Sequence, residues 1–121
     1  MVKSYRELIV WRKGIESVKT VYITVQRFPR EEVYGLADQL KRASVSIPSN
    51  IAEGQARQST KEFRQFLFIA LGSLAEVDTQ LVIAHELGFI GISELNKLVD
   101  DHVVGLRKMI NGLLNKLTTD H

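Results

Sequence analysis

Polar side chains recur at helical spacing over residues 42–57, and their types suit either anion binding or hydrogen bonding between helices. At about 100° per residue they fall on one narrow face: Arg42, Ser46, Ser49, Asn50, Glu53 and Arg57. Arginine can form paired hydrogen bonds with a phosphate or a carboxylate. In a functional interpretation, Arg42 and Arg57 contact RNA phosphates, with Asn50 beside them.

The same face has a structural interpretation, which we favour. These side chains would then form a hydrogen-bonded network between helices, for example with Glu76 or Gln80. Glu53 precedes Arg57 by four residues, a spacing at which an ion pair forms within one helix without a ligand. The Gly72-Ser73 pair further along the chain predicts close packing of two helices, because small side chains let backbones approach.

Basic residues are concentrated in the first half of the chain. Residues 1–64 have a charge balance of +5, whereas residues 65–121 have a balance of −3. This asymmetry can mark a nucleic-acid interface, two surfaces that attract each other in an oligomer, or only the charges that helical surfaces need. The candidate RNA-binding residues are Arg12, Lys13, Lys19, Lys41, Arg42, Asn50, Arg57, Lys61 and Arg64.

Exposed aromatic rings would favour single-strand recognition, since unpaired bases stack on them. The sequence places Trp11, Phe63 and other rings at apolar helical positions, so Tyr5 and Tyr34 are the rings expected to be exposed. This pattern argues against sequence-specific reading of RNA.

Motifs for catalysis, metals and cofactors are absent from the sequence. There is no cysteine, and the histidines are His85, His102 and His121. Val82 and Val99 stand where a di-iron bundle needs glutamate three residues before histidine. Zinc-protease, P-loop and serine-hydrolase motifs are also missing, and adjacent Asp100, Asp101 and His102 would point in different directions. We predict a protein that is not an enzyme and has no cofactor or metal.

Two long amphipathic helices are expected to position the basic half. The first covers residues 5–27, with a capping box of Ser4 and Glu7 and an apolar stripe of Leu8, Trp11, Ile15, Val18, Tyr22 and Val25. The second covers residues 34–57, with Leu36, Leu40, Ala43, Ile47 and Ile51. Pro48 lies inside it, so this segment is either one kinked helix or two shorter helices.

Two further helices follow. Ser59 and Glu62 form a second capping box, and Gly88 is a left-handed C-terminal stop. Between them runs a heptad-like seam of Phe63, Leu67, Ala70, Leu74, Val77, Leu81 and Ala84. The last helix starts at an N-cap near Ser93, with a stripe of Val99, Val103, Leu106, Ile110, Leu113 and Leu117.

Four such helices with short links predict an all-α, antiparallel up-and-down four-helix bundle, as a single domain over residues 1–121. Excess apolar surface on the first and third helices indicates a lateral homo-oligomer interface; the alternative is a thick core that buries wide stripes. The chain has 45% hydrophobic and 25% charged residues, which is typical of soluble globular proteins. It has no uninterrupted apolar run of about 20 residues, no secretory signal and no disulfides, so we expect a cytoplasmic protein without membrane contact.

Several runs in the chain resemble a known family. They are Gln39-x-x-Arg42-Ala43-Ser44-x-Ser46-Ile47-x-x-Asn50-Ile51-Ala52-Glu53-Gly54, then Arg57-x-Ser59, Glu62-Phe63-x-x-Phe66-Leu67, Ile69-Ala70-Leu71-Gly72-Ser73-x-x-Glu76 and Leu87-Gly88. Together they are similar to the four-helix-bundle family named after the protein encoded in 23S ribosomal RNA intervening sequences. The opening Leu8-x-Val10-Trp11-x-x-x-Ile15 fits as well.

This resemblance implies a small four-helix bundle whose motif residues form a polar network: Arg42, Ser46, Asn50, Glu53, Gly54, Arg57 and Glu76. It also implies a homo-oligomer. Relatives, including an accessory protein of diversity-generating retroelements, form ring-shaped pentamers with a basic surface that engages RNA and a reverse transcriptase. This chain is less basic than those relatives.

The sequence therefore favours two candidate functions. One is an oligomeric accessory protein whose Lys and Arg residues bind RNA phosphates without sequence specificity. The other is a scaffold bundle whose partner is another protein, with no nucleic-acid role.

Overall fold

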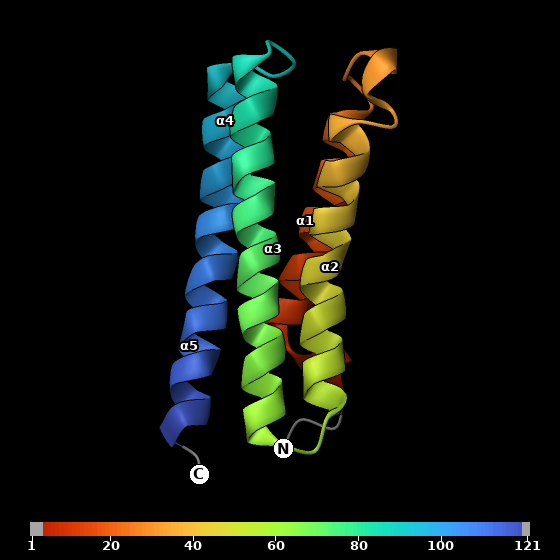
Figure 1. Ribbon diagram of the computed structural model, residues 1–121. Helices are drawn as coiled ribbons and strands as arrows, with labels where there is room; N and C mark the ends of the chain where they lie inside the picture. Colours follow the sequence, from red (N-terminus) through yellow and green to blue (C-terminus); the bar gives the residue numbers. More distant parts are fainter. Residues whose placement is uncertain (1–3, 120–121) are drawn as a thin grey trace.

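The computed structural model describes residues 4–119, and every regular element over this range is helical. The long helical stretches run up and down side by side as an antiparallel bundle (Figure 1). α2 packs between α1 and α3, and the last stretch, from α4 to α5, lies beside α3. The predicted all-α four-helix bundle is confirmed.

The first long helix starts later than its capping box predicts. The chain first makes a 3₁₀ turn, η1 (Tyr5–Glu7), in which the Ser4 hydroxyl accepts a hydrogen bond from the Arg6 N–H. Leu8 is then extended, and α1 spans Ile9–Val25. Ser4 therefore caps the 3₁₀ turn, while α1 begins without a side-chain cap.

α1 buries a different face from the one that its large apolar residues predict. Ile15 and Tyr22 of the predicted stripe are exposed. A Cβ added at Gly14 would lie 3.2 Å from the Pro48 Cβ, so small residues let α1 approach α2 closely at this point. The buried positions of α1 are Val10, Gly14, Ser17, Val21, Thr24 and Val25.

α2 (Leu36–Ala56) is one helix that continues through Pro48. It follows the 3₁₀ turn η2 (Arg30–Glu32), and the Leu36 N–H donates to the Glu32 carboxylate at 3.0 Å. Pro48 is buried against α1, and Ile47 and Ile51 beside it are buried as well. This burial offsets the hydrogen bond that a proline inside a helix removes. Of the two alternatives for this segment, the single helix is correct.

α3 (Thr60–Glu86) follows the sequence prediction closely. The Ser59 hydroxyl accepts from the Glu62 N–H at its N-terminus. At its C-terminus Gly88 has a φ of +83°, and the Phe89 N–H donates to the Ala84 carbonyl at 2.8 Å. These contacts satisfy end groups that the helix itself cannot pair. The predicted seam is buried from Leu67 to Ala84, and Phe63 packs against the core.

The fourth stretch consists of three consecutive elements: α4 (Ile92–Leu98), the π-helical segment η3 (Val99–Val104) and α5 (Gly105–Thr119). Gly91, and not Ser93, is the N-cap. A π turn accommodates more residues than an α turn, so it shifts which side chains face the core. The buried residues are Leu95, Leu98, Val103, Leu106, Ile110 and Leu114, with Leu114 in place of the predicted Leu113.

α3 also presents apolar side chains outside the core. Phe68, Ile69, Val82 and Ile83 are exposed, and Gly72 has no atom within 4 Å of an added Cβ, so it makes no close packing contact within the described chain. By length and composition alone α3 meets the criterion for a membrane span, with 39% of its most apolar window buried. Core helices of soluble proteins meet the same criterion.

Candidate nucleic-acid interface

A buried polar network joins α2 to α3 at the centre of the predicted polar stripe. The Ser46 and Ser73 hydroxyls lie 2.8 Å apart, and the Asn50 side-chain amide donates to the Ser46 carbonyl at 2.8 Å and to its hydroxyl at 2.9 Å. Ser73 is buried, while Ser46 and Asn50 are half-buried. Buried polar groups need such partners, so this part of the stripe is structural.

Gly54 allows the C-terminal end of α2 to pack closely against the start of α3. A Cβ at this position would lie 2.7 Å from the Phe66 Cβ and 3.0 Å from Phe63 Cδ1. These separations leave no room for any other residue unless α3 moves. Gly54 is therefore explained by helix packing and needs no ligand.

The two arginines of the stripe are held in separate surface ion pairs. The Arg42 Nε donates to the Asp38 carboxylate at 2.9 Å, and this hydrogen bond raises the pKa of Arg42 above its ordinary value. Arg57 lies 3.4 Å from Glu53 and stands 5.2 Å from the centre of the Phe66 ring. Within the described residues, neither guanidinium hydrogen-bonds to Ser46, Asn50 or Ser73. Asp38 was missed in the sequence, although it precedes Arg42 by four residues.

Glu76 and Gln80 line a groove between α2 and α3, together with Gln39, Arg42, Ala43 and Ser46. Glu76 is exposed, whereas Gln80 is only 8% exposed. The Gln80 Oε1 atom has no hydrogen-bond partner within residues 4–119. Over residues 4–119, neither Glu76 nor Gln80 hydrogen-bonds to Ser46, Asn50 or Ser73, so the observed network has fewer members than the predicted one.

The basic residues of α1 and α2 occupy more than one face. Arg12 and Lys19 are exposed on α1, and the Lys41 ammonium of α2 stands 5.1 Å from the centre of the Tyr22 ring, which places it between these helices. Lys13 lies elsewhere on α1, pairs with Glu16 at 3.5 Å and faces His102. The predicted RNA-binding residues of α1 therefore do not form one surface.

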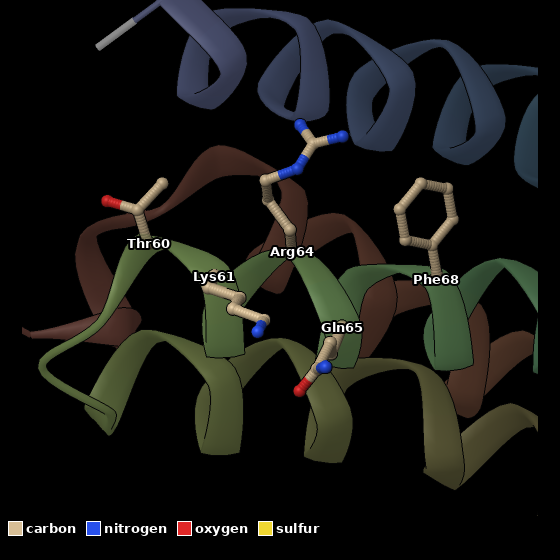
Figure 2. Close-up of a pocket in the computed structure, with 5 residues that line it drawn as sticks. All are labelled: Thr60, Lys61, Arg64, Gln65 and Phe68. Atoms are coloured by element: carbon tan, nitrogen blue, oxygen red, sulfur yellow. The ribbon is translucent and has the colours of Figure 1, made fainter. Parts of the chain in front are cut away.

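A second basic cluster lies where α3 begins. Arg57, Lys61 and Arg64 are close in sequence around the turn from α2 to α3, with only Glu62 as an acidic residue among positions 54–64. Figure 2 shows a groove here, with a volume of about 410 Å³, lined by Thr60, Lys61, Arg64, Gln65 and Phe68. Arg64 reaches towards α5, where its Nη1 donates to the Leu114 carbonyl at 2.6 Å.

Phe68 corrects the sequence prediction about exposed rings. It is 54% exposed in the groove, and the Arg64 guanidinium stands 5.7 Å from its ring centre. Tyr34 is exposed as predicted, but Tyr5 is half-buried against Trp11. The signal that identifies Phe68 was present in the sequence, since Phe68 lies outside the heptad seam of α3.

His102 occupies a polar position that the sequence did not reveal. It belongs to η3, and its Nδ1 lies 2.8 Å from the buried Ser17 hydroxyl of α1. Burial lowers the pKa of His102 below its usual value. Within the described part of the chain, no group of three or more acidic, histidine or cysteine side chains is arranged to hold a metal.

Comparison with known proteins identifies a family and a fold. The model of the 23S rRNA-intervening sequence protein family matches residues 6–112. Among solved structures, the chain is similar to a protein of unknown function from the S23 ribosomal protein family of Bacteroides thetaiotaomicron. The TM-score is 0.77 and the sequence identity 21%, with 88% of this chain and 98% of that chain covered. No curated protein matches the chain.

Proposed function

The chain belongs to the 23S rRNA-intervening sequence protein family, and from this premise we propose that it is a non-enzymatic, RNA-associated accessory protein of the cytoplasm. It would bind RNA phosphates through lysine and arginine side chains. Such binding depends on charge, shows little sequence specificity and weakens steeply with salt.

The observation that carries this proposal is the basic cluster at the start of α3. Lys61 is exposed there and forms no ion pair with any residue among 4–119, and Arg57 and Arg64 flank it. Arg12, Lys19 and Lys41 supply a second set of cations on α1 and α2.

The local contacts narrow the candidate residues. Arg42 and Lys13 are each paired with a neighbouring carboxylate, and the Asn50 amide group is engaged with Ser46. These residues are weaker candidates for phosphate contacts than Lys61, whose ammonium has no carboxylate partner among the described residues.

The proposal is tested by measuring RNA affinity as a function of salt for Lys61→Ala and for Lys108→Ala. Lys108 is an exposed lysine of the acidic half and serves as the matched control. We expect Lys61→Ala to weaken binding and to reduce the log–log salt slope by about 0.7–0.9, the value for one lost phosphate contact. Equal effects of the two variants would contradict the assignment.

We further propose that the chain acts as a homo-oligomer, and the family resemblance suggests a pentamer. Support comes from apolar side chains left exposed on α3 and α1, among them Ile69, Ile83 and Ile23. Surfaces of this kind are commonly protein interfaces. Light scattering tests this assembly, and a mass of 13.7 kDa at micromolar concentration would contradict it.

The same apolar surface favours a second candidate function, a scaffold that binds another protein. Gly72 and Ala75 are exposed on α3 between these apolar side chains, and small residues allow a partner helix to approach closely. Absence of RNA binding at low salt, with an intact fold, would favour this function over the first.

A further inference from the structure

We propose that the groove at the start of α3 binds one unpaired nucleotide, with its base on the Phe68 ring and a neighbouring phosphate on Lys61. This inference rests on the proposed RNA association and adds what kind of RNA the groove selects. It predicts a preference for single-stranded RNA over duplex.

The first argument is the exposure of Phe68 among cations. A phenyl ring that is 54% exposed leaves apolar surface in water, which is unfavourable unless a partner covers it. Phe68 shares the groove with Lys61 and Arg64 (Figure 2). Aromatic rings combined with positive charge are typical of surfaces that bind single strands.

The second argument is the way in which Arg64 is held. Its guanidinium donates to the Leu114 carbonyl of α5 and stands 5.7 Å from the Phe68 ring. It thus lies over the ring as part of the groove wall, and an arginine plane can itself stack on a base. Lys61 is exposed and has no ion pair within the part of the chain that the structure describes, so it remains to contact a phosphate.

The third argument concerns size and selectivity. The volume of about 410 Å³ lies within the ~300–1,000 Å³ of small-molecule sites, and the lining combines the Phe68 ring with the polar or charged side chains of Thr60, Lys61, Arg64 and Gln65. The Gln65 amide on the rim offers a donor and an acceptor to a base edge. Bases of an RNA duplex are stacked inside the helix and cannot lie on Phe68, so only an unpaired base fits.

Two other exposed rings lie outside this groove. Tyr22 is 42% exposed and has the Lys41 ammonium 5.1 Å from its ring centre, but it lies between α1 and α2 and does not line the groove at the start of α3. Tyr34 is 95% exposed but lies just after η2, at the opposite end of the bundle from the start of α3 (Figure 1). It provides a matched control, because removing its ring changes exposed aromatic surface without changing the groove.

The test compares the affinities of wild type, Phe68→Leu, Phe68→Tyr and Tyr34→Leu for a fluorescent single-stranded RNA of about 12 nucleotides and for the matching duplex. We expect Phe68→Leu to weaken single-strand binding by about 5- to 100-fold, the effect of losing one stacked base. Duplex affinity and the salt slope should stay unchanged, and Phe68→Tyr and Tyr34→Leu should bind like wild type.

Four results would overturn the inference. If Phe68→Leu binds both RNAs like wild type, or if it weakens binding to both equally, the ring does not read an unpaired base. If Phe68→Leu lowers the oligomer mass and leaves RNA affinity unchanged, a second copy covers the ring instead. If wild type binds neither RNA, the proposed function itself fails. If wild type binds RNA and Phe68→Leu does not weaken single-strand binding selectively, only the inference about the groove fails.

Discussion

At the scale of single residues, small polar and glycine positions determine how α2 and α3 meet. Ser46, Asn50 and Ser73 form hydrogen bonds with one another between α2 and α3. Gly54 allows the two helices to pack closely. The sequence motif draws attention to these residues as candidate ligand contacts. Their hydrogen bonds and separations instead explain them as packing features, which leaves the surface cations as the residues available for RNA.

Ser73→Ala tests the structural role of the network. It removes the hydroxyl of α3 that hydrogen-bonds to Ser46 of α2. We therefore expect the free energy of unfolding to fall by about 1 kcal/mol and the melting temperature to fall by about 4 °C. RNA affinity should not change. Ser93→Ala is the control, since Ser93 is exposed and caps no helix. A Ser73→Ala protein as stable as wild type would contradict the network.

Gly54, near the C-terminal end of α2, and Gly72, in the middle of α3, are two helical glycines with contrasting surroundings. Gly54→Ala should destabilise the protein by about 1–3 kcal/mol, because the new methyl collides with Phe66. Gly72→Ala has open space and should stabilise the protomer by up to about 1 kcal/mol. Urea unfolding measures both. If Gly72→Ala lowers the oligomer mass, the α3 surface is an assembly contact. Equal changes in the free energy of unfolding for the two variants would contradict the packing argument.

His102 should make stability depend on pH. Burial lowers its pKa in the folded protein below the unfolded value of about 6.5, against a smaller opposing effect of Asp101. The unfolded chain therefore binds more protons below pH 6.5. The stabilising contribution is complete above that pH and is lost as the pH falls through the folded pKa. Melting temperatures from pH 8 to 5 should fall more for wild type than for His102→Gln; parallel curves would contradict this.

At the scale of elements, the π-helical segment η3 decides which side of the fourth stretch is buried. Leu98 and Val103 are both buried although five residues apart, and this spacing is too long for an α-helical stripe. From there the buried positions continue through Ile110 to Leu114.

Leu114→Ala and Leu113→Ala test which face of α5 is buried. Leu114 is buried, so its truncation should cost about 2–5 kcal/mol, the range for a buried leucine. Leu113 is only half-buried and should cost clearly less. Denaturant unfolding measures the difference. The opposite order would contradict the face of α5 that the structure buries.

The elements also show what the sequence can and cannot predict. Both ends of α3 and its seam follow from local chemistry: a serine cap, a left-handed glycine and a regular heptad spacing. The buried face of α1 does not, because Gly14 and Ser17 carry no hydrophobic signal and their burial depends on Pro48 and His102 from other helices.

The candidate site was likewise predicted only in part, because some of its contacts come from other helices. Lys61 and Arg64 stand out as charges in a basic segment, and the structure places them in one groove. Phe68 was not among the predicted site residues. It lies four residues after Arg64 on the same helix, but the Leu114 carbonyl that holds Arg64 belongs to α5 and is brought there only by the fold.

At the scale of the whole molecule, charge and apolar surface are the features that point to partners. The basic half of the chain forms α1, α2 and the start of α3, whereas the acidic half forms the rest of α3 and the fourth stretch. A protomer with this division can attract phosphates on one side and a second protomer through the other. RNA association and assembly are thus compatible.

The most direct test of RNA association is the affinity of the wild-type protein for a structured RNA, measured from about 50 to 200 mM salt. The account predicts binding at the lowest salt and a linear fall of log affinity with log salt, steep enough for several neutralised phosphates at about 0.9 each. No binding at the lowest salt, or an affinity that salt does not change, would contradict the proposed function.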